Sequence, residues 1–182
     1  MPQSSFLSDG SLFLSFWASR HPNAEPMGWK LRETATPWAR FHALPQSKRY
    51  AESDIDRAIV LSRANALGSA LLNAGAPCWI VEARADDIEG DGEFFGSYRE
   101  EQDAPTWRYY VREGIWENGK FDTEIAQIAD DGPAYIIWIS LKTGSIFAPY
   151  DGGFDLFPSS ENGVEQLRKE YADWLSDRDD GL

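Results

Sequence analysis

The chain has 182 residues, of which 42% are hydrophobic, and this fits one globular domain spanning residues 1–182. Its formal net charge is −13, from 17 basic and 30 acidic side chains. An acidic surface of this kind repels phosphate, so neither nucleic acid nor an anionic membrane is expected as a partner. The aromatic content of 14% is too high for a disordered chain.

The cysteine and histidine content limits the possible cofactors and the compartment. A single cysteine, Cys78, cannot form an internal disulfide, which indicates a reducing compartment and predicts a cytoplasmic location. One cysteine and two histidines cannot build a zinc site of the cysteine–histidine type. No metal or other cofactor is predicted. No apolar run reaches the length of a membrane span.

The first quarter of the chain predicts one helix and one strand. Residues 1–10 form a loose lead-in, and apolar spacing over Ser11–Arg20 indicates a short helix, although alternation at its start also permits a strand. Pro22 ends this element, because proline disfavours helix in the residue before it. Residues 22–37 carry three prolines and no clear period, which indicates a wrapping segment. Side chains alternate between two faces over Trp38–Leu44, which predicts a strand.

The clearest helix signal covers residues 54–74. Ser53 is a suitable N-cap with Asp56 three residues later, and Gly75 provides a C-terminal stop. Five apolar residues at helical spacing form a continuous stripe, namely Val60, Ala64, Leu67, Leu71 and Ala74. This pattern predicts an amphipathic helix that lies on an apolar sheet.

Short apolar segments predict that sheet. Residues 78–81 are apolar on both faces, as in an interior strand, and residues 107–112 alternate, as in a strand with one face in water. The Asn-Gly pair within residues 115–122 is typical of a two-residue hairpin. Residues 134–141 are the most apolar run and are predicted to form the central strand.

The C-terminal part predicts two further strands and a helix. Tight turns precede the strands at 145–150 and 154–157, and Asn162 can cap a helix over residues 163–175. Tight turns imply antiparallel pairing. We therefore predict an α+β fold, a single domain with a mainly antiparallel sheet of about five to seven strands and helices packed on one face.

Charge is polarised along the chain. Residues 28–63 carry seven cations and four acids, a local +3, whereas residues 82–103 carry nine acids and two arginines, a local −7. The acidic residues predict a solvated loop at 86–104 and an acidic tail at 177–182. If the basic residues also gather in space, one small electropositive site lies within an acidic field. A ligand is expected there.

Six residues are candidates for binding a ligand or partner. Arg40 and His42 share one face of a predicted strand, with basic residues close behind in the chain, and a cationic neighbourhood could suit His42 as a general base. A histidine that is hydrogen-bonded within the strand is the preferred interpretation. Asp151-Gly152-Gly153 is interpreted as a turn with aromatic residues on either side, and in the alternative interpretation Asp151 and Asp155 face a basic group at one end of the sheet. The candidates are Arg40, His42, Lys48, Arg49, Tyr150 and Asp151.

Motifs that would specify a chemistry are missing. The chain has neither a G-x-S-x-G elbow for a nucleophile nor a glycine-rich loop for phosphate. Asp87, Glu89 and Asp91 occupy the first positions of a calcium-loop template, but its twelfth position is Tyr98 in place of the required glutamate. No calcium site and no catalytic residue are predicted.

Two segments resemble an uncharacterised bacterial family, a domain of unknown function. The motifs are RFHxLPxSKRY at residues 40–50 and PYDGG at residues 149–153, and the resemblance covers residues 38–75 and 134–176. It implies a compact domain and supplies no chemistry. It also implies that the candidate residues in the two motifs, Arg40, Arg49, Tyr150 and Asp151, form one polar cluster.

Three functions are compatible with these observations. The preferred one is a non-enzymatic protein-interaction domain with an unknown protein partner, because tyrosine and tryptophan commonly anchor interfaces. The second is an immunity-type inhibitor whose acidic face blocks a basic toxin or nuclease. The third is an enzyme or small-anion-binding domain that uses Arg40, His42 and Arg49, and it requires a concave pocket joining those side chains. The oligomeric state is not determined by the sequence.

Overall fold

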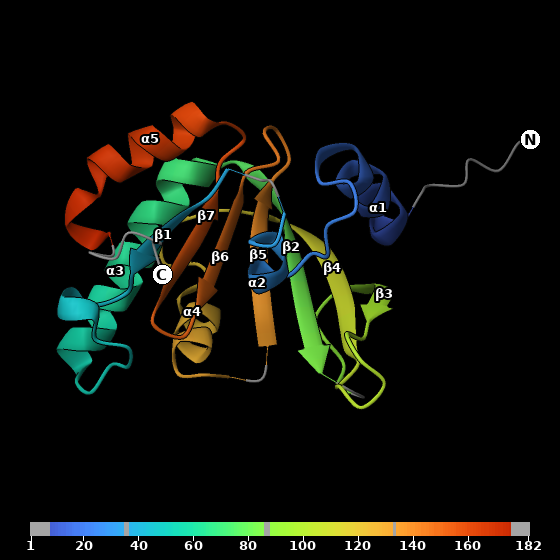
Figure 1. Cartoon of the computed structure of the whole chain (residues 1–182), viewed down its shortest axis with the longest axis horizontal. Coiled ribbons are helices and arrows are strands. Elements are labelled where there is room, and N and C mark those ends of the chain that lie inside the picture. The colour runs from blue at the N-terminus through green and yellow to red at the C-terminus, as the bar shows by residue number, and fades with distance from the viewer. Residues whose placement is uncertain (1–7, 35–36, 86–87, 133, 176–182) are drawn as a thin grey trace, which may run out of the picture.

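The computed structural model describes residues 8–34, 37–85, 88–132 and 134–175 (Figure 1). Helices and seven strands are distributed along this part of the chain. In chain order the elements are α1 (Asp9–Arg20), α2 (Gly28–Leu31), β1 (Ala39–His42), a 3₁₀ turn (Pro45–Ser47), α3 (Asp54–Leu72), β2 (Pro77–Ala85), β3 (Glu93–Tyr98), β4 (Trp107–Ile115), α4 (Asp122–Ala129), β5 (Ala134–Ser140), β6 (Ile146–Tyr150), β7 (Gly153–Phe157), α5 (Glu161–Glu170) and a 3₁₀ turn (Ala172–Trp174).

The seven strands form one antiparallel sheet in the order β1-β7-β6-β5-β2-β4-β3. The most apolar strand of the sequence, β5, occupies the centre, as predicted. It buries Ile136 and Trp138 in one core and Ile137 and Ile139 in the other. A strand that is apolar on both faces must be covered on both. The predicted α+β single domain with an antiparallel sheet is thus confirmed.

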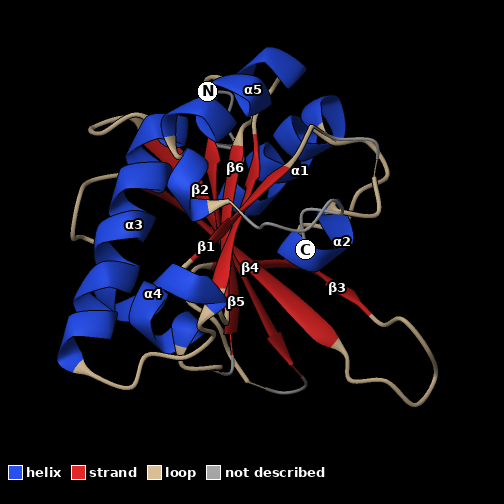
Figure 2. Ribbon diagram, turned by 60° about the vertical axis from the view of Figure 1, so that its left-hand side comes forward, coloured by secondary structure: helices blue, strands red, loops and turns tan. Residues whose placement is uncertain are grey.

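Helices cover both faces of the sheet, whereas the sequence interpretation placed them on one (Figure 2). The larger core packs α3, α4 and α5 against one face around Trp116 and Trp138. On the other face, Phe13 and Trp17 of α1 and Leu31 of α2 pack against residues such as Trp79 of β2. The predicted wrapping segment contains α2, because its Leu31 completes this second core.

The long helix α3 forms for the reasons given by its sequence. The Ser53 Oγ accepts a hydrogen bond from the Asp56 N–H at 3.1 Å, and the stripe through Leu67 is buried. Gly68 lies within this face, where an added Cβ would come 2.1 Å from Cζ2 of Trp116. The absence of a side chain at Gly68 therefore lets the helix approach a fully buried tryptophan.

Two local predictions are wrong. The expected hairpin over residues 115–122 is a turn that leads into α4, because the Asn65 side chain accepts a hydrogen bond from the Gly119 N–H at 2.8 Å and donates one to the Asp122 carboxylate at 2.8 Å. The cap of α5 is Ser160 instead of Asn162, since the Ser160 Oγ accepts from the Gly163 N–H at 3.3 Å.

The acidic segment is more ordered than a loop. The strand β3 lies inside the range 86–104 that the sequence assigns to an acidic loop, and it pairs with β4. Residues 1–7 of the lead-in and the tail at 177–182 lie outside the described residues. Across the described part of the chain, no helix has the length and apolar character needed to cross a membrane.

Candidate functional site

The two central strands β5 and β6 separate along their length. They pair at Trp138–Phe147 and Ile139–Ile146, while β5 stays paired with β2 as far as Ala134 and β6 stays paired with β7 as far as Tyr150. Continuing the register places Pro149 opposite Ile136. Proline has no N–H to donate to a neighbouring strand, so its presence here favours the separation.

A cavity of about 310 Å³ occupies this separation, and we call it the β5–β6 cleft. Residues of β5 and β6 form its sides, and α2 lies across it. A Cβ on Gly28 would lie 2.9 Å from that of Ala148, so α2 approaches the sheet closely. The lining consists of Gly28, Trp29, Arg32, Tyr135, Ile136, Ile137, Ala148, Pro149, Tyr150, Asp151 and Asp155.

A buried carboxylate, Asp155, forms the floor of the cleft. Its Oδ1 accepts hydrogen bonds from the Trp38 Nε1 and the Arg40 Nε, each at 3.0 Å, and its Oδ2 lies 3.6 Å from the Arg32 Nε. Burial raises the pKa of Asp155, and the neighbouring Arg40 guanidinium acts in the opposite direction. Removing either partner of such a pair would leave an uncompensated charge in the interior.

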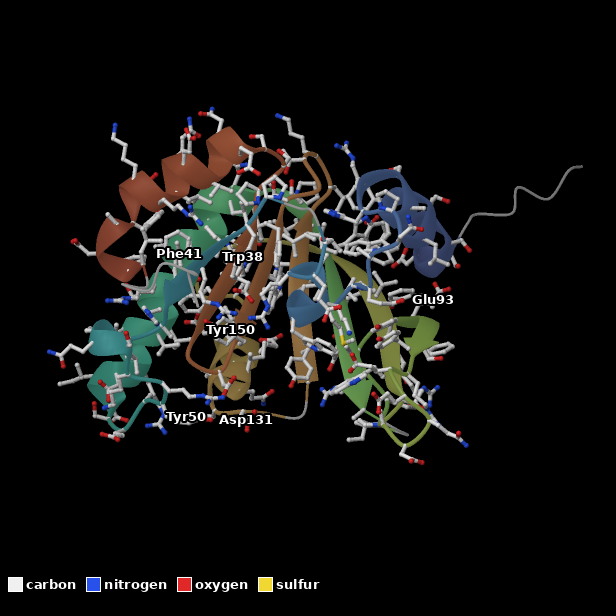
Figure 3. The ribbon with its side chains drawn as sticks, in the orientation of Figure 1. Trp38, Phe41, Tyr50, Glu93, Asp131 and Tyr150 are labelled. Carbon is white, nitrogen blue, oxygen red and sulfur yellow. The ribbon has the colours of Figure 1, made fainter. Side chains whose placement is uncertain are left out.

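Tyr150 is held over the same floor. The Arg40 guanidinium lies 4.7 Å from the Tyr150 ring and 5.3 Å from the Trp38 ring, so both aromatic rings contact it. Trp38 and Tyr150 are labelled in Figure 3. Cross-strand pairing places Gly153 beside Tyr150, and this neighbour without a side chain leaves room for the phenol. Burial raises the pKa of Tyr150, so its hydroxyl stays protonated and can donate a hydrogen bond.

The predicted polar cluster is divided into two ion pairs. Arg40 pairs with Asp155, whereas the Arg49 Nε donates to the Asp151 Oδ2 at 2.8 Å at the rim of the cleft. Tyr50 also donates to Asp151, at 3.1 Å. Asp151 lies in the expected turn, and each of the two aspartates has an arginine of its own, Arg49 for Asp151 and Arg40 for Asp155.

Lys48 and His42 do not line the cleft. The Lys48 ammonium binds Asp56 at 2.7 Å and Glu52 at 2.9 Å, and the first of these hydrogen bonds is the main reason that its pKa is raised. His42 Nε2 lies 3.3 Å from the Oγ of the exposed Ser47.

The sequence interpretation missed three lining side chains, Trp29, Arg32 and Tyr135. Trp29 and Arg32 belong to the proline-rich stretch that was interpreted as a wrapping segment, and Tyr135 belongs to the strand that was expected to be buried. The basic charge of residues 28–63 includes Arg32 and was the one available signal.

A second feature lies at the far end of the sheet, where β3, β4 and the loops beyond them extend away from α3, α4 and α5 (Figure 2). We call residues 88–106 the acidic tip. Ile88 and Phe94 are 48% and 47% exposed there. The tip has one cation, Arg99, and its exposed acids are Glu89, Asp91, Glu93, Glu100, Glu101 and Asp103.

Contacts with the body of the protein hold the acidic tip in place. Asp91 pairs with Arg112 of β4 at 2.7 Å, and its N–H donates to the buried Glu82 at 2.8 Å. Glu93 accepts a hydrogen bond from the Gly10 N–H at 3.2 Å, which ties β3 to α1 (Figure 3). The tip therefore presents its side chains from a fixed backbone.

The described residues contain no group of three or more side chains that could hold a metal ion. Among protein families, the model of a domain of unknown function (DUF3885) matches residues 27–179, a range that includes every lining residue of the cleft and the whole acidic tip. Neither the curated proteins nor the solved structures give a match.

Proposed function

We propose a function from the geometry of this chain, which belongs to the DUF3885 family, a domain of unknown function. It is a non-enzymatic domain that binds a basic protein partner through the acidic tip. The observation that carries this proposal is the exposure of Ile88 and Phe94 on a projecting sheet end whose other exposed side chains include six acids. Apolar anchors surrounded by a charged rim are typical of protein interfaces.

The distribution of ion pairs supports a basic partner over an anionic substrate. The three basic residues that the sequence analysis named as candidates for binding a ligand, Arg40, Lys48 and Arg49, all pair with carboxylates of the same chain. At the tip, Asp91 pairs with Arg112 and Glu100 pairs with Lys30. Glu89 and Asp103, by contrast, are exposed and form no ion pair with another described residue. Their negative potential would attract a basic surface and accelerate association.

The fixed backbone of the tip also favours binding. A partner need not order β3, because its pairing with β4 already does so, and this lowers the entropic cost of association. The Arg108 guanidinium lies 5.0 Å from the Phe94 ring and holds that anchor at the surface. An immunity-type inhibitor of a basic toxin or nuclease is the narrower form of this proposal, with a cytoplasmic location.

The test is affinity capture from the source organism followed by calorimetry with the purified partner. Two variants of the tip are compared with the wild type. One replaces three acids (Glu89→Gln, Glu101→Gln, Asp103→Asn), and the other replaces the apolar anchor (Phe94→Ser). We expect a partner of high isoelectric point and a loss of affinity of roughly tenfold or more in each variant. Raising the salt from about 50 mM to about 300 mM should weaken wild-type binding, because screening shortens the range of the field.

The matched control removes the same charges from the opposite end of the molecule (Glu161→Gln, Glu165→Gln, Asp173→Asn). All three residues are exposed on or beside α5. A captured partner that is acidic, or an affinity that the control lowers as much as the tip variant does, would show that the acidic tip is not the binding surface. If the partner is a toxin or nuclease, loss of its activity in the complex identifies the narrower form.

A further inference from the structure

We propose that the β5–β6 cleft binds a small aryl carboxylic acid, with the carboxylate on Arg32 and the ring between Trp29, Tyr135 and Tyr150. The proposal concerns a different site from the acidic tip and does not depend on the partner proposed above.

Two guanidinium groups share one carboxylate on the floor of the cleft. Arg40 is the closer partner of Asp155, at 3.0 Å, and its side chain is only 8% exposed. Arg32 is 3.6 Å away and its side chain is 30% exposed. Since Arg40 already neutralises Asp155, the charge of Arg32 is in excess. Among the described residues the Arg32 side chain makes no hydrogen bond, and its Nε comes no closer than 3.6 Å to Asp155, so its N–H groups remain available to a ligand.

The other carboxylate in the lining does not compete for Arg32. Asp151 binds both Arg49 and Tyr50 at the rim. The exposed Asp131 lies near Tyr50 at this same end of the sheet (Figure 3). The floor of the cleft is therefore positive, while its rim is neutral to negative. A guanidinium that makes no hydrogen bond of its own can match the fork of a carboxylate.

The walls suit a flat apolar body. Trp29 of α2 faces a lining that includes Tyr135 and Ile137 of β5 and Tyr150 of β6. Aromatic walls with a small number of polar groups are typical of small-molecule sites. The cavity of about 310 Å³ lies at the lower end of the range of such sites, roughly 300 to 1,000 Å³. A ligand with one ring and a short acid chain is the matching size.

The separation of the strands gives this cavity a cause in the sequence. Pro149 prevents the strand pairing that would close the cleft at Ile136, and Gly28 allows α2 to cover it. The net charge of −13 opposes an anionic ligand from a distance. At physiological salt the Debye length is only about 8 Å, so the local floor charge decides binding inside the cleft.

The experiment titrates the full chain with 3-phenylpropionate, using calorimetry and the indole N–H signals in NMR spectra. Three probes serve as comparisons: phenethylamine reverses the charge, 3-phenylpropanol removes it, and inorganic phosphate keeps a negative charge but has no ring. A short peptide ending in phenylalanine tests whether the carboxylate comes from a chain terminus. We expect one molecule of 3-phenylpropionate to bind and the Trp29 indole signal to shift. The peptide should bind more weakly, because the cleft has room for one ring and a short acid chain but not for the additional peptide backbone.

Arg32→Gln should weaken binding by between about tenfold and a hundredfold, since it removes a charge-assisted hydrogen bond. Arg32→Lys, which keeps the charge but loses the fork, should fall between this variant and the wild type. Arg57→Gln is the matched control, because Arg57 is half exposed on α3, outside the cleft. Thermal unfolding checks that each variant is folded, and Asp155 retains Arg40 in all of them.

Four results would overturn the proposal. These are no binding of 3-phenylpropionate at millimolar concentration, equal binding by Arg32→Gln and the wild type, tighter binding of phenethylamine than of the acid, or equal binding of inorganic phosphate. Tighter binding of the peptide would assign the site to a chain terminus instead of a free acid. None of these results bears on the acidic tip, which the partner-binding variants test separately.

Discussion

Gly153→Ala tests whether the close packing under Tyr150 holds the cleft together. A Cβ at this position would lie 2.4 Å from the Tyr150 hydroxyl oxygen and 2.6 Å from the Phe41 carbonyl oxygen. The phenol could rotate away from the first contact. The second contact is with the backbone of β1, so it can be relieved only if β1 and β7 move apart.

The cost follows from these two contacts. Inserting a methyl group into a well-packed region costs roughly 1 to 3 kcal/mol. Displacing Tyr150 also removes its contact with the Arg40 guanidinium, which is only 8% exposed, and a desolvated contact of this kind contributes about 2 kcal/mol. We therefore expect a loss of about 3 to 5 kcal/mol in the free energy of unfolding. In a chain of 182 residues this lowers Tm by roughly 6 to 20 °C.

Chemical denaturation with urea, followed by circular dichroism, measures this loss. Gly96→Ala is the matched control, because Gly96 also lies in a strand and a Cβ there would meet no atom within 4 Å. Its unfolding free energy should change by less than about 0.5 kcal/mol. If Gly153→Ala proves as stable as Gly96→Ala, the packing of Tyr150 against β1 is not as rigid as argued.

Three further predictions concern the rest of the fold. Gly68→Ala should lower the free energy of unfolding, measured in urea, by about 1 to 3 kcal/mol, because the added Cβ would clash with the buried Trp116. Alanine is the better helix former, so a variant more stable than the wild type would contradict this clash. The pKa of Asp56 is lowered from 3.8 to about 2, chiefly by its hydrogen bond from Lys48. A lowered pKa stabilises the fold above pH 3.8, and this effect is lost as the pH falls through 2. Asp56→Asn should therefore be less stable than the wild type at pH 7, and the difference should be much smaller at pH 2. Burial raises the pKa of the Cys78 thiol to about 11, so a thiol-reactive dye should label it only upon unfolding; rapid labelling of the folded protein would refute its burial.

The pattern of side chains along the chain determined most of the elements. The central position of β5 follows from eight consecutive residues with almost no polar side chain, which only an interior strand could bury. The long helix α3 follows from its cap and its apolar stripe. In both cases the signal lies within one segment, and the prediction required no knowledge of distant residues.

Predictions failed where a distant residue decides the local structure. The Asn-Gly pair before Lys120 leads into a helix because Asn65 binds both Gly119 and Asp122 from α3. The second layer of helices was missed because α2 is one turn long and has little periodicity. Its place depends on the pocket that the sheet offers to Leu31.

The candidate site likewise combines features that are visible within one segment and features that depend on distant residues. The sequence identified Arg40, Tyr150, Asp151 and a charge-polarised chain, because these are properties of the residues themselves. Which carboxylate binds which arginine was decided only by the pairing of β1 with β7, which sets Arg40 opposite Asp155. The polarised charge is likewise a property of the sequence. The excess positive charge at Arg32 arises because Arg32, Arg40 of β1 and Asp155 of β7 come together at the base of the cleft. Burial and cross-strand neighbours exist only in the folded chain, and they determine which of the charges remain available to a ligand.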